Sequence, residues 1–266
     1  MMASFAREPT PARRLDSLNP VRFTLLTYNI HRAIGVDRKF RPERIVEILE
    51  HYNADIVLLQ EVDCGVPRSK HLDLAEIIAR ALQYDYHALG LNVTLKKGKY
   101  GNATLSRFPI GRQRNIDLTF GWRKKRGAQH TRLQIPCGRR SVALEVFNVH
   151  LGLSARERRE QVHRLLNSPE VARLEPGQSC MVAGDMNDWR GVLRRRCFIG
   201  AGFHCATNRH SGFRWSIKTF PSYAPTGGLD KIFYRGPLKL LHVRRSRLKL
   251  AKVASDHLPV IAEFEL

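Results

Sequence analysis

The chain has 266 residues, of which 43% are hydrophobic and 26% charged, a composition typical of a globular protein and unlike that of a fibrous or disordered one. Lysine and arginine number 45 against 24 acidic residues, so the formal net charge is +21 at pH 7. No apolar run approaches the ~18 residues that a membrane-spanning helix requires, and so basic a surface favours nucleic acid, anionic membranes or other phosphate-ester polyanions as partners.

Residues 1–20 contain three prolines and three arginines but no apolar segment, and we expect a flexible basic N-terminal arm rather than a secretion signal. Residues 21–266 contain no linker-like stretch and are expected to form one domain that acts as a monomer. The five cysteines are scattered and include no C-x-x-C pair. This usage is typical of a reducing compartment, so we expect a cytoplasmic protein.

From residue 21 onward, β-rich runs alternate with helical patterns. The strands are expected over residues 22–29, 54–62, 102–108, 110–118, 129–135, 141–150, 181–185, 229–234 and 258–265. Amphipathic helices are expected over residues 42–52 and 72–82, and a third begins at Ser154, whose spacing to Glu157 matches a capping box. This alternation predicts an α/β domain that contains mixed sheet.

Polar side chains stand where these strands end or begin. Four follow apolar strands directly, at the carboxyl ends where ligands bind in α/β sheets. The others precede strands, and they reach the same edge if those strands run antiparallel to the rest. The seven groups are Asn29, Glu61, His150, Asp185, Asp230, Asp256 and His257. We expect them to line one solvent-facing cleft, although any single one of them could simply form a turn.

The residue types at these positions suit proton transfer to and from water. Asp185 can orient and deprotonate a water molecule, while the amide of Asn187 can hold that water or a phosphoryl oxygen without adding negative charge. His257 can carry a proton near neutral pH. Asp230 can keep the imidazole of His257 in one orientation.

Other groups in this set offer oxygen atoms to a metal ion. Glu61 and Asn29 supply a carboxylate and an amide, and Asp256 supplies a second carboxylate. Mg²⁺ prefers oxygen ligands and retains several waters, so this donor set is appropriate for it. No spacing of histidines and cysteines resembles a zinc or copper site.

Six short strings occur in an order that resembles the endonuclease/exonuclease/phosphatase superfamily. They are TYNIH (27–31), LLQEVD (58–63), NVHLG (148–152), GDMND (184–188), LDKIF (229–233) and SDHLP (255–259). The segment YGNATLSRFP (100–109) looks like the family's stretch between the second and third motifs. The resemblance spans residues 22–266 and implies a four-layer α/β sandwich, in which two face-to-face mixed β-sheets are flanked by helices.

The resemblance also implies hydrolysis of phosphate esters with Mg²⁺ or Mn²⁺ as cofactor. In the implied catalytic set, Asp185 and Asn187 act on the attacking water, and His257, paired with Asp230, stabilises the phosphoryl oxygens. The implied contacts to the scissile phosphate come from His150 and Tyr100. Carried over in the same way, Glu61 is the principal metal ligand, Asn29 lies near it and Asp256 assists.

We expect a metal-dependent phosphodiesterase, and most of all a nuclease that cleaves DNA or RNA by in-line attack of water. A phospholipid or inositol-phosphate phosphodiesterase or phosphatase of the same superfamily is the alternative, and a non-catalytic basic binding module is a remoter one. Trp189 follows the GDMND motif and could stack on a base or a sugar, or pack as part of the wall. Basic runs at residues 122–126, 194–196 and 244–249 could contact a polyanion.

Overall fold

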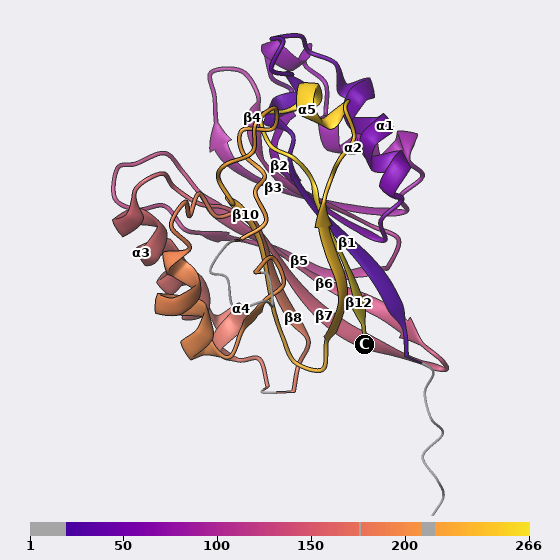
Figure 1. Ribbon diagram of the computed structural model, residues 1–266, viewed down its shortest axis with the longest axis vertical. Helices are drawn as coiled ribbons and strands as arrows, with labels where there is room; N and C mark the ends of the chain where they lie inside the picture. Colours follow the sequence, from indigo (N-terminus) through magenta and orange to yellow (C-terminus); the bar gives the residue numbers. More distant parts are fainter. Residues whose placement is uncertain (1–19, 176, 209–215) are drawn as a thin grey trace, which may run out of the picture.

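The computed structural model describes residues 20–175, 177–208 and 216–266, so the arm predicted over residues 1–20 lies outside the described residues except for Pro20. Two six-stranded mixed sheets have the strand orders β11-β12-β1-β2-β4-β3 and β5-β6-β7-β8-β10-β9. Helices lie on the outer sides of this pair of sheets (Figure 1). The four-layer α/β sandwich predicted from the sequence is confirmed.

The first sheet contains one parallel pair, β1 with β2, and its other neighbours are antiparallel. Its strands are β1 (Arg22–Asn29), β2 (Ile56–Cys64), β3 (Tyr86–Thr94), β4 (Lys99–Ser106), β11 (Lys239–Arg245) and β12 (Val260–Glu265). The sequence analysis missed β3 and β11. Both are edge strands whose residues are mostly exposed or half-buried, so neither forms a continuous apolar run, and the alternation of Leu89, Leu91 and Val93 in β3 was overlooked.

The second sheet also contains one parallel pair, β7 with β8. Its strands are β5 (Ile110–Asp117), β6 (Gly127–Cys137), β7 (Arg140–His150), β8 (Cys180–Asp185), β9 (His204–Cys205) and β10 (Asp230–Arg235). Strand β10 runs antiparallel to β8, and their register places Asp230 opposite Asp185.

The helices divide between the two outer faces. Those that join the apolar cluster on the outer side of the first sheet are α1 (Pro42–Tyr52), α2 (Leu74–Ala81) and α5 (Ala251–Ala254). Those that join the cluster on the second sheet are α3 (Ala155–Leu166), α4 (Pro169–Ala172) and the π-helix η3 (Arg194–Phe198). Short 3₁₀ helices span His31–Ala33 (η1), Pro67–Ser69 (η2) and Ile199–Ala201 (η4). Among the described residues, no helix is long and apolar enough to cross a membrane.

Local capping explains where two of these helices begin. The carboxylate of Asp73 accepts hydrogen bonds from the backbone N–H groups of Ala75 and Glu76 at the start of α2. At the start of α3, the hydroxyl of Ser154 accepts one from the N–H of Glu157, as the capping spacing predicts. The predicted start of the third helix is therefore confirmed.

The space between the two sheets is apolar in its main part and polar near the edge where the polar groups gather. An apolar cluster, which includes Leu25 of β1 and Val146 of β7, fills its main part. Beyond it lies a buried polar network in which Gln60 donates to the side-chain oxygens of Thr27 (3.1 Å) and Asn148 (2.8 Å). Because buried polar groups are costly unless they are hydrogen-bonded, this network ties the two sheets together in one register beneath the site.

Candidate active site

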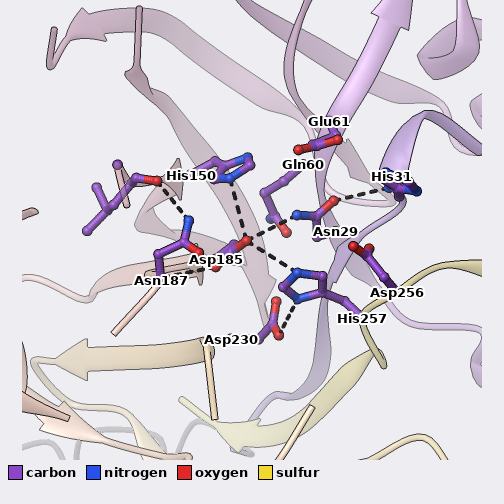
Figure 2. A network of polar contacts seen from close by, with 12 residues as sticks. Asn29, His31, Gln60, Glu61, His150, Asp185, Asn187, Asp230, Asp256 and His257 are labelled. Carbon is purple, nitrogen blue, oxygen red and sulfur yellow. Dashed lines mark hydrogen bonds and ion pairs between the residues drawn. The ribbon is translucent and has the colours of Figure 1, made fainter. Parts of the chain in front are cut away.

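The topology brings the seven polar groups to one edge of the sandwich. Strands β1, β2, β7 and β8 end there, while β10 and β12 begin there because each is antiparallel to its neighbour. The condition stated from the sequence, that the last two strands run antiparallel to the others, is therefore met. Figure 2 shows the resulting group around Asp185.

Asp185 is the hub of the group and is 1% exposed. Its Oδ2 accepts a hydrogen bond from Asn29 Nδ2 at 3.1 Å and lies 3.5 Å from His150 Nε2 and 3.6 Å from His257 Nε2. Its Oδ1 accepts the backbone N–H of Asn187 at 2.9 Å (Figure 2). The carboxylate is therefore oriented by contacts from three other segments of the chain and from the turn that follows it.

The imidazole of His257 lies between two carboxylates. Its Nδ1 donates to Asp230 Oδ2 at 2.9 Å, and Thr219 donates its hydroxyl to the same oxygen. The ring of Phe220 packs against that of His257, with centroids 5.0 Å apart. The ring of His257 is thus held in one orientation, with Nε2 toward Asp185.

The surroundings shift the pKa values of these groups apart. Burial by itself lowers the pKa of His257, but the charges of Asp230 and Asp185 outweigh it and raise that pKa to about 10. Burial raises the pKa of Asp185 to about 6, against the opposing effect of His257. Burial, with Arg126 next in effect, keeps the pKa of His150 well below its usual value. At neutral pH, His257 is a cation, Asp185 is mostly ionised and His150 is neutral.

These shifts predict a pH dependence of stability. The pKa of His257 is higher in the folded protein than its ordinary value of 6.5, so its ionic contacts stabilise the fold fully below about pH 6.5. That contribution disappears as the pH rises toward 10. In metal-free protein, we expect the difference in Tm between the wild type and His257→Gln to shrink steadily over this interval. A difference that stays constant from pH 6.5 to 10, measured by calorimetry, would contradict this expectation.

The prediction of a solvent-facing cleft is wrong for the centre of the site. Asp185, Asp230 and His257 are each less than 5% exposed, whereas Glu61 and Asp256 are half-buried. The reason is that the loop carrying Thr219 and Phe220 covers Asp230 and His257. Substitutions at the centre therefore affect stability as well as chemistry, because they alter buried charges.

The glycine of the GDMND motif allows β8 to lie close to β7. Gly184 has φ +136°, and a Cβ atom there would stand 2.0 Å from the carbonyl oxygen of Val149. This approach sets Asp185 opposite His150 in the parallel pair. The following turn places Asn187 at φ +49°, where its side-chain Nδ2 donates to the carbonyl of Leu151 at 2.9 Å.

Glu61 does not end its strand as predicted. Strand β2 continues to Cys64, and its pairing with β4 shifts register between Leu59 and Val62. Glu61 lies in this irregularity with φ +56°. A bulge re-aims a side chain out of the regular alternation, and here Arg32 Nε lies 3.3 Å from Glu61 Oε2.

A second group of oxygen atoms lies on the other side of Asp185 from Asn187, formed by Glu61, Asn29 and Asp256 (Figure 2). Asn29, at the end of β1, pairs with Gln60 of β2, the residue before Glu61. The hydroxyl of Ser255 donates to the carbonyl of Asn29 at 2.7 Å and lies 3.3 Å from Asp256 Oδ1. Two carboxylates and an amide form the hard oxygen set that suits Mg²⁺ or Mn²⁺, so these residues fit such an ion.

Asp185, Asp230 and His257 also offer three atoms within 4.8 Å of one another, a spacing at which side chains can hold a metal. Their hydrogen bonding accounts for the cluster without one. Both ring nitrogens of His257 face carboxylate oxygens, and a protonated ring already supplies the positive charge there.

The turn after β1 has an unusual backbone. His31, Arg32 and Ala33 have φ values of 46°, 62° and 58°, a left-handed conformation that costs non-glycine residues about 1–3 kcal/mol each. Within it, the N–H of His31 donates to Asn29 Oδ1 at 3.1 Å. Since Asn29 Nδ2 donates to Asp185, the turn holds the amide with its oxygen away from Asp185.

Tyr100 lies on the inner face of β4, directed toward the site. Asn102, two residues along the same face, donates to the carbonyl of Asn148, which precedes His150 by two residues on β7. Because side chains alternate along a strand, Tyr100 lies on the same face as Asn102, and His150 on the same face as Asn148. Tyr100 and His150 are each two residues closer to the edge where the site lies, on facing sheets. The hydroxyl of Tyr100 is buried without a hydrogen-bond partner, and its ring lies 5.4 Å from the Arg68 guanidinium and 4.9 Å from Lys124 Nζ.

Trp189 is 54% exposed at the margin of the site. Its ring meets the edge of Phe220 at a centroid distance of 5.5 Å and lies against Gly227. Since Phe220 packs on His257, the surface next to His257 is aromatic and, at Trp189, open to solvent.

The sequence analysis missed several residues that organise the site. Gln60 and Asn148 form the polar network beneath it, Thr219 contacts Asp230, and Ser255 links Asn29 to Asp256. For Gln60 and Asn148 a signal was present, since both are polar residues inside apolar strands. Thr219 carried none, because only the tertiary structure brings its loop to Asp230.

Hydrolysis of phosphate esters is the chemistry for which a buried carboxylate beside an imidazolium, with an adjacent all-oxygen donor set, is suited. The chain belongs to the Endonuclease/Exonuclease/phosphatase family, whose sequence model matches residues 26–257. It is accordingly a member of a family of phosphoester hydrolases, which generally depend on a divalent metal.

The comparisons with individual proteins agree with this assignment. The chain is 31% identical over 263 residues to the "Uncharacterized protein YbhP" of Escherichia coli (strain K12), covering 94% of this chain and 99% of that protein. Among solved structures, an endonuclease/exonuclease/phosphatase from Beutenbergia cavernae superimposes with a TM-score of 0.73 at 21% identity, over 92% of this chain and 72% of that one.

Two further structures of similar fold differ in what they act on. D. rerio TDP2 complexed with a single-strand DNA product has a TM-score of 0.68 at 15% identity, over 91% of this chain and 98% of that one. The mannosyl-6-phosphatase Bt3783 of Bacteroides thetaiotaomicron has a TM-score of 0.68 at 18% identity, over 91% and 99% of the two chains. At these identities, the similarity concerns the fold.

Proposed function

We propose that this protein is a divalent-metal-dependent phosphodiesterase that hydrolyses nucleic acid by in-line attack of water. The observation that carries the proposal is the arrangement of Asp185 and His257. A carboxylate that is ionised above about pH 6 lies 3.6 Å from an imidazolium that stays charged to about pH 10. One group can accept the proton of a water while the other stabilises negative charge on phosphate oxygens.

Each side chain then has a defined task. Asp185 deprotonates the attacking water, which Asn187 helps to hold. His257, oriented by Asp230, donates a hydrogen bond to the phosphoryl oxygens. Two further phosphate contacts come from His150 and from the unpartnered hydroxyl of Tyr100.

The oxygen set of Glu61, Asn29 and Asp256 would hold Mg²⁺ or Mn²⁺. When bound, the ion neutralises charge on the phosphate and on the leaving group. The Arg32 Nε atom lies 3.3 Å from Glu61 Oε2, so positive charge is favoured at this position.

Three features support nucleic acid as the substrate class. The net charge is +21. Trp122 is 96% exposed on a loop that also carries Arg123, Lys124 and Lys125, and Trp189 offers a half-exposed ring against Phe220. Exposed aromatic rings on a basic surface suit the stacking of bases and contact with the backbone. The structural neighbour with bound single-strand DNA agrees with this choice.

Metal dependence is tested by removing and restoring the ion. We expect hydrolysis of plasmid DNA or single-stranded oligonucleotide to fall below detection in excess chelator and to return with Mg²⁺ or Mn²⁺, because the donor set contains only oxygen. Full activity in excess chelator would contradict the metal site. RNA, abasic duplex, phosphatidylinositol phosphates and sphingomyelin are run in parallel, with Asp185→Asn as the control for contaminating enzymes.

The basic surface predicts a steep dependence of binding on salt. Asp185→Asn protein should bind DNA with an affinity that falls as salt rises, by a log–log slope of about −0.9 for each duplex phosphate contacted. Reversal of charge at Arg123 and Lys125, both exposed, should flatten that slope and raise KM without changing kcat on a short soluble diester. Tight binding to anionic vesicles with negligible binding to DNA, across the same salt series, would favour a lipid substrate instead.

A further inference from the structure

A cavity of about 230 Å³ lies next to the candidate active site, between the first turn of α3 and the π-helix η3. Four arginines line it, Arg156, Arg158 and Arg159 from α3 and Arg196 from η3, together with Asp188. Asp188 directly follows Asn187, so the cavity begins one residue beyond the proposed water-holding amide.

The electrostatic character of the cavity is positive. Four arginines and one carboxylate line it, and Oδ2 of that carboxylate accepts the N–H of Leu193 at 2.8 Å. The cavity also adjoins the N-terminal turn of a 12-residue helix, where the backbone carries partial positive charge. Both features attract an anion.

Arg158 is an independent observation that favours an anion at this place. The residue is 8% exposed, its Nε is buried without a hydrogen-bond partner, and its NH1 donates to the carbonyl of Leu153. Burial lowers the pKa of Arg158, with Asp188 and Glu157 acting in the opposite direction. A buried guanidinium normally has its donors satisfied, and Arg158 lines the cavity with its Nε unpaired among the described residues.

The size of the cavity limits what it can hold. Its volume is several times the ~30 Å³ occupied by one water molecule and lies below the roughly 300–1,000 Å³ of sites that enclose a drug-sized ligand. A single phosphate group fits this space.

We propose that this cavity binds a second phosphate of the substrate, namely a backbone phosphate neighbouring the scissile one along a nucleic-acid strand. The proposal rests on the proposed function and makes it more specific. A strand carries a phosphate at every nucleotide, so a polymer held at Asn187 presents another phosphate to adjacent surface. Substrates with one phosphate lack this contact, and the cavity therefore selects for polymers.

The test compares two pairs of arginines that remove equal charge. Arg159→Gln with Arg196→Gln alters the lining of the cavity, and Arg194→Gln with Arg195→Gln alters the same helix η3 outside it. Each protein is assayed on a single-stranded oligodeoxynucleotide and on a soluble p-nitrophenyl phosphodiester that contains one phosphate. Because charge-assisted hydrogen bonds are strong, we expect the first pair to raise KM for the oligonucleotide by roughly tenfold or more and to leave both constants for the single-phosphate diester unchanged.

A binding measurement separates this proposal from the proposed function. Each pair is placed in Asp185→Asn protein, and binding of the labelled oligonucleotide is followed by fluorescence anisotropy. Weaker binding in the first pair alone supports the cavity even if turnover is absent. Binding to vesicles that contain phosphatidylinositol phosphates is measured in parallel. Equal effects of the two pairs on oligonucleotide binding would overturn the proposal, as would a first pair that weakens binding to the vesicles but not to the oligonucleotide. Failure of the wild type to cleave any phosphodiester would contradict the proposed function instead.

Discussion

Replacement of Asp185 by Asn is expected to lower kcat by roughly 100-fold or more, the usual scale for losing a general base. Asn preserves the size of the side chain and can still accept the N–H of Asn187, but its NH2 group then replaces the oxygen that accepts from Asn29 and faces His257. The Tm of the variant is therefore measured beside its turnover. The measurement is steady-state turnover of the single-phosphate diester at pH 7.5 with Mg²⁺. A decrease of less than about fivefold would exclude Asp185 as the base.

The pH profile gives a second readout for the same residue. Burial raises the pKa of Asp185 to about 6, so the turnover of the wild type should decline as the pH falls through that value. The residual turnover of Asp185→Asn should lack this decline. Asp188→Asn is the matched control, since Asp188 lies on the same loop and its Asn replacement can still accept the N–H of Leu193. We expect the control to retain the turnover of the wild type on this substrate.

Loss of the imidazolium is expected to have a comparable effect. His257→Gln should lower kcat by roughly 100-fold or more, because the cation that stabilises the phosphoryl oxygens is removed. Asp230→Asn should have a milder effect of the same kind, since Asp230 acts through the orientation and charge of His257. If so, the double variant should be little worse than His257→Gln alone. Effects that multiply would mean that the two residues act separately.

Measurements of stability test the pairing of Asp230 with His257 independently of turnover. Asp230 is fully buried and accepts hydrogen bonds from His257 and Thr219. Asp230→Ala leaves a buried cation with one of its two carboxylates, and removing one partner of a buried pair costs about 3–5 kcal/mol. Asp230→Asn keeps an acceptor and should cost less. Chemical denaturation of the metal-free variants measures this order, and a reversed order would contradict the proposed pairing.

Much of the site could be predicted from the sequence because polar residues stand where the apolar strands of an α/β protein end. A run such as MVAGD places its last residue where the chain leaves the packed sheet, and polar residues at several such ends point to one edge. The order of the short strings added the family resemblance, which the family match over residues 26–257 bears out. Edge strands β3 and β11 were missed because neither is a continuous apolar run, although Leu89, Leu91 and Val93 alternate with other residues in β3.

Position along a strand did not predict the conformation of Glu61. The apolar run before Glu61 predicts a regular strand that ends at this residue. Instead, the pairing of β2 with β4 shifts register and leaves Glu61 in a bulge with positive φ. The same holds for the left-handed turn at His31–Ala33, which contains no glycine. Local propensity disfavours both conformations, and only contacts with neighbouring segments maintain them.

The sequence by itself determined the fold class, the strand ends at which polar groups stand and the oxygen-rich character of the donor set, since these follow from local patterning and residue chemistry. Only the tertiary structure decided that Asp185 lies between His150 and His257 and that the centre of the site is buried. It also decided that four arginines surround a cavity beside Asp188. Contacts between residues far apart in the chain set distances and desolvation, and these in turn set the pKa values.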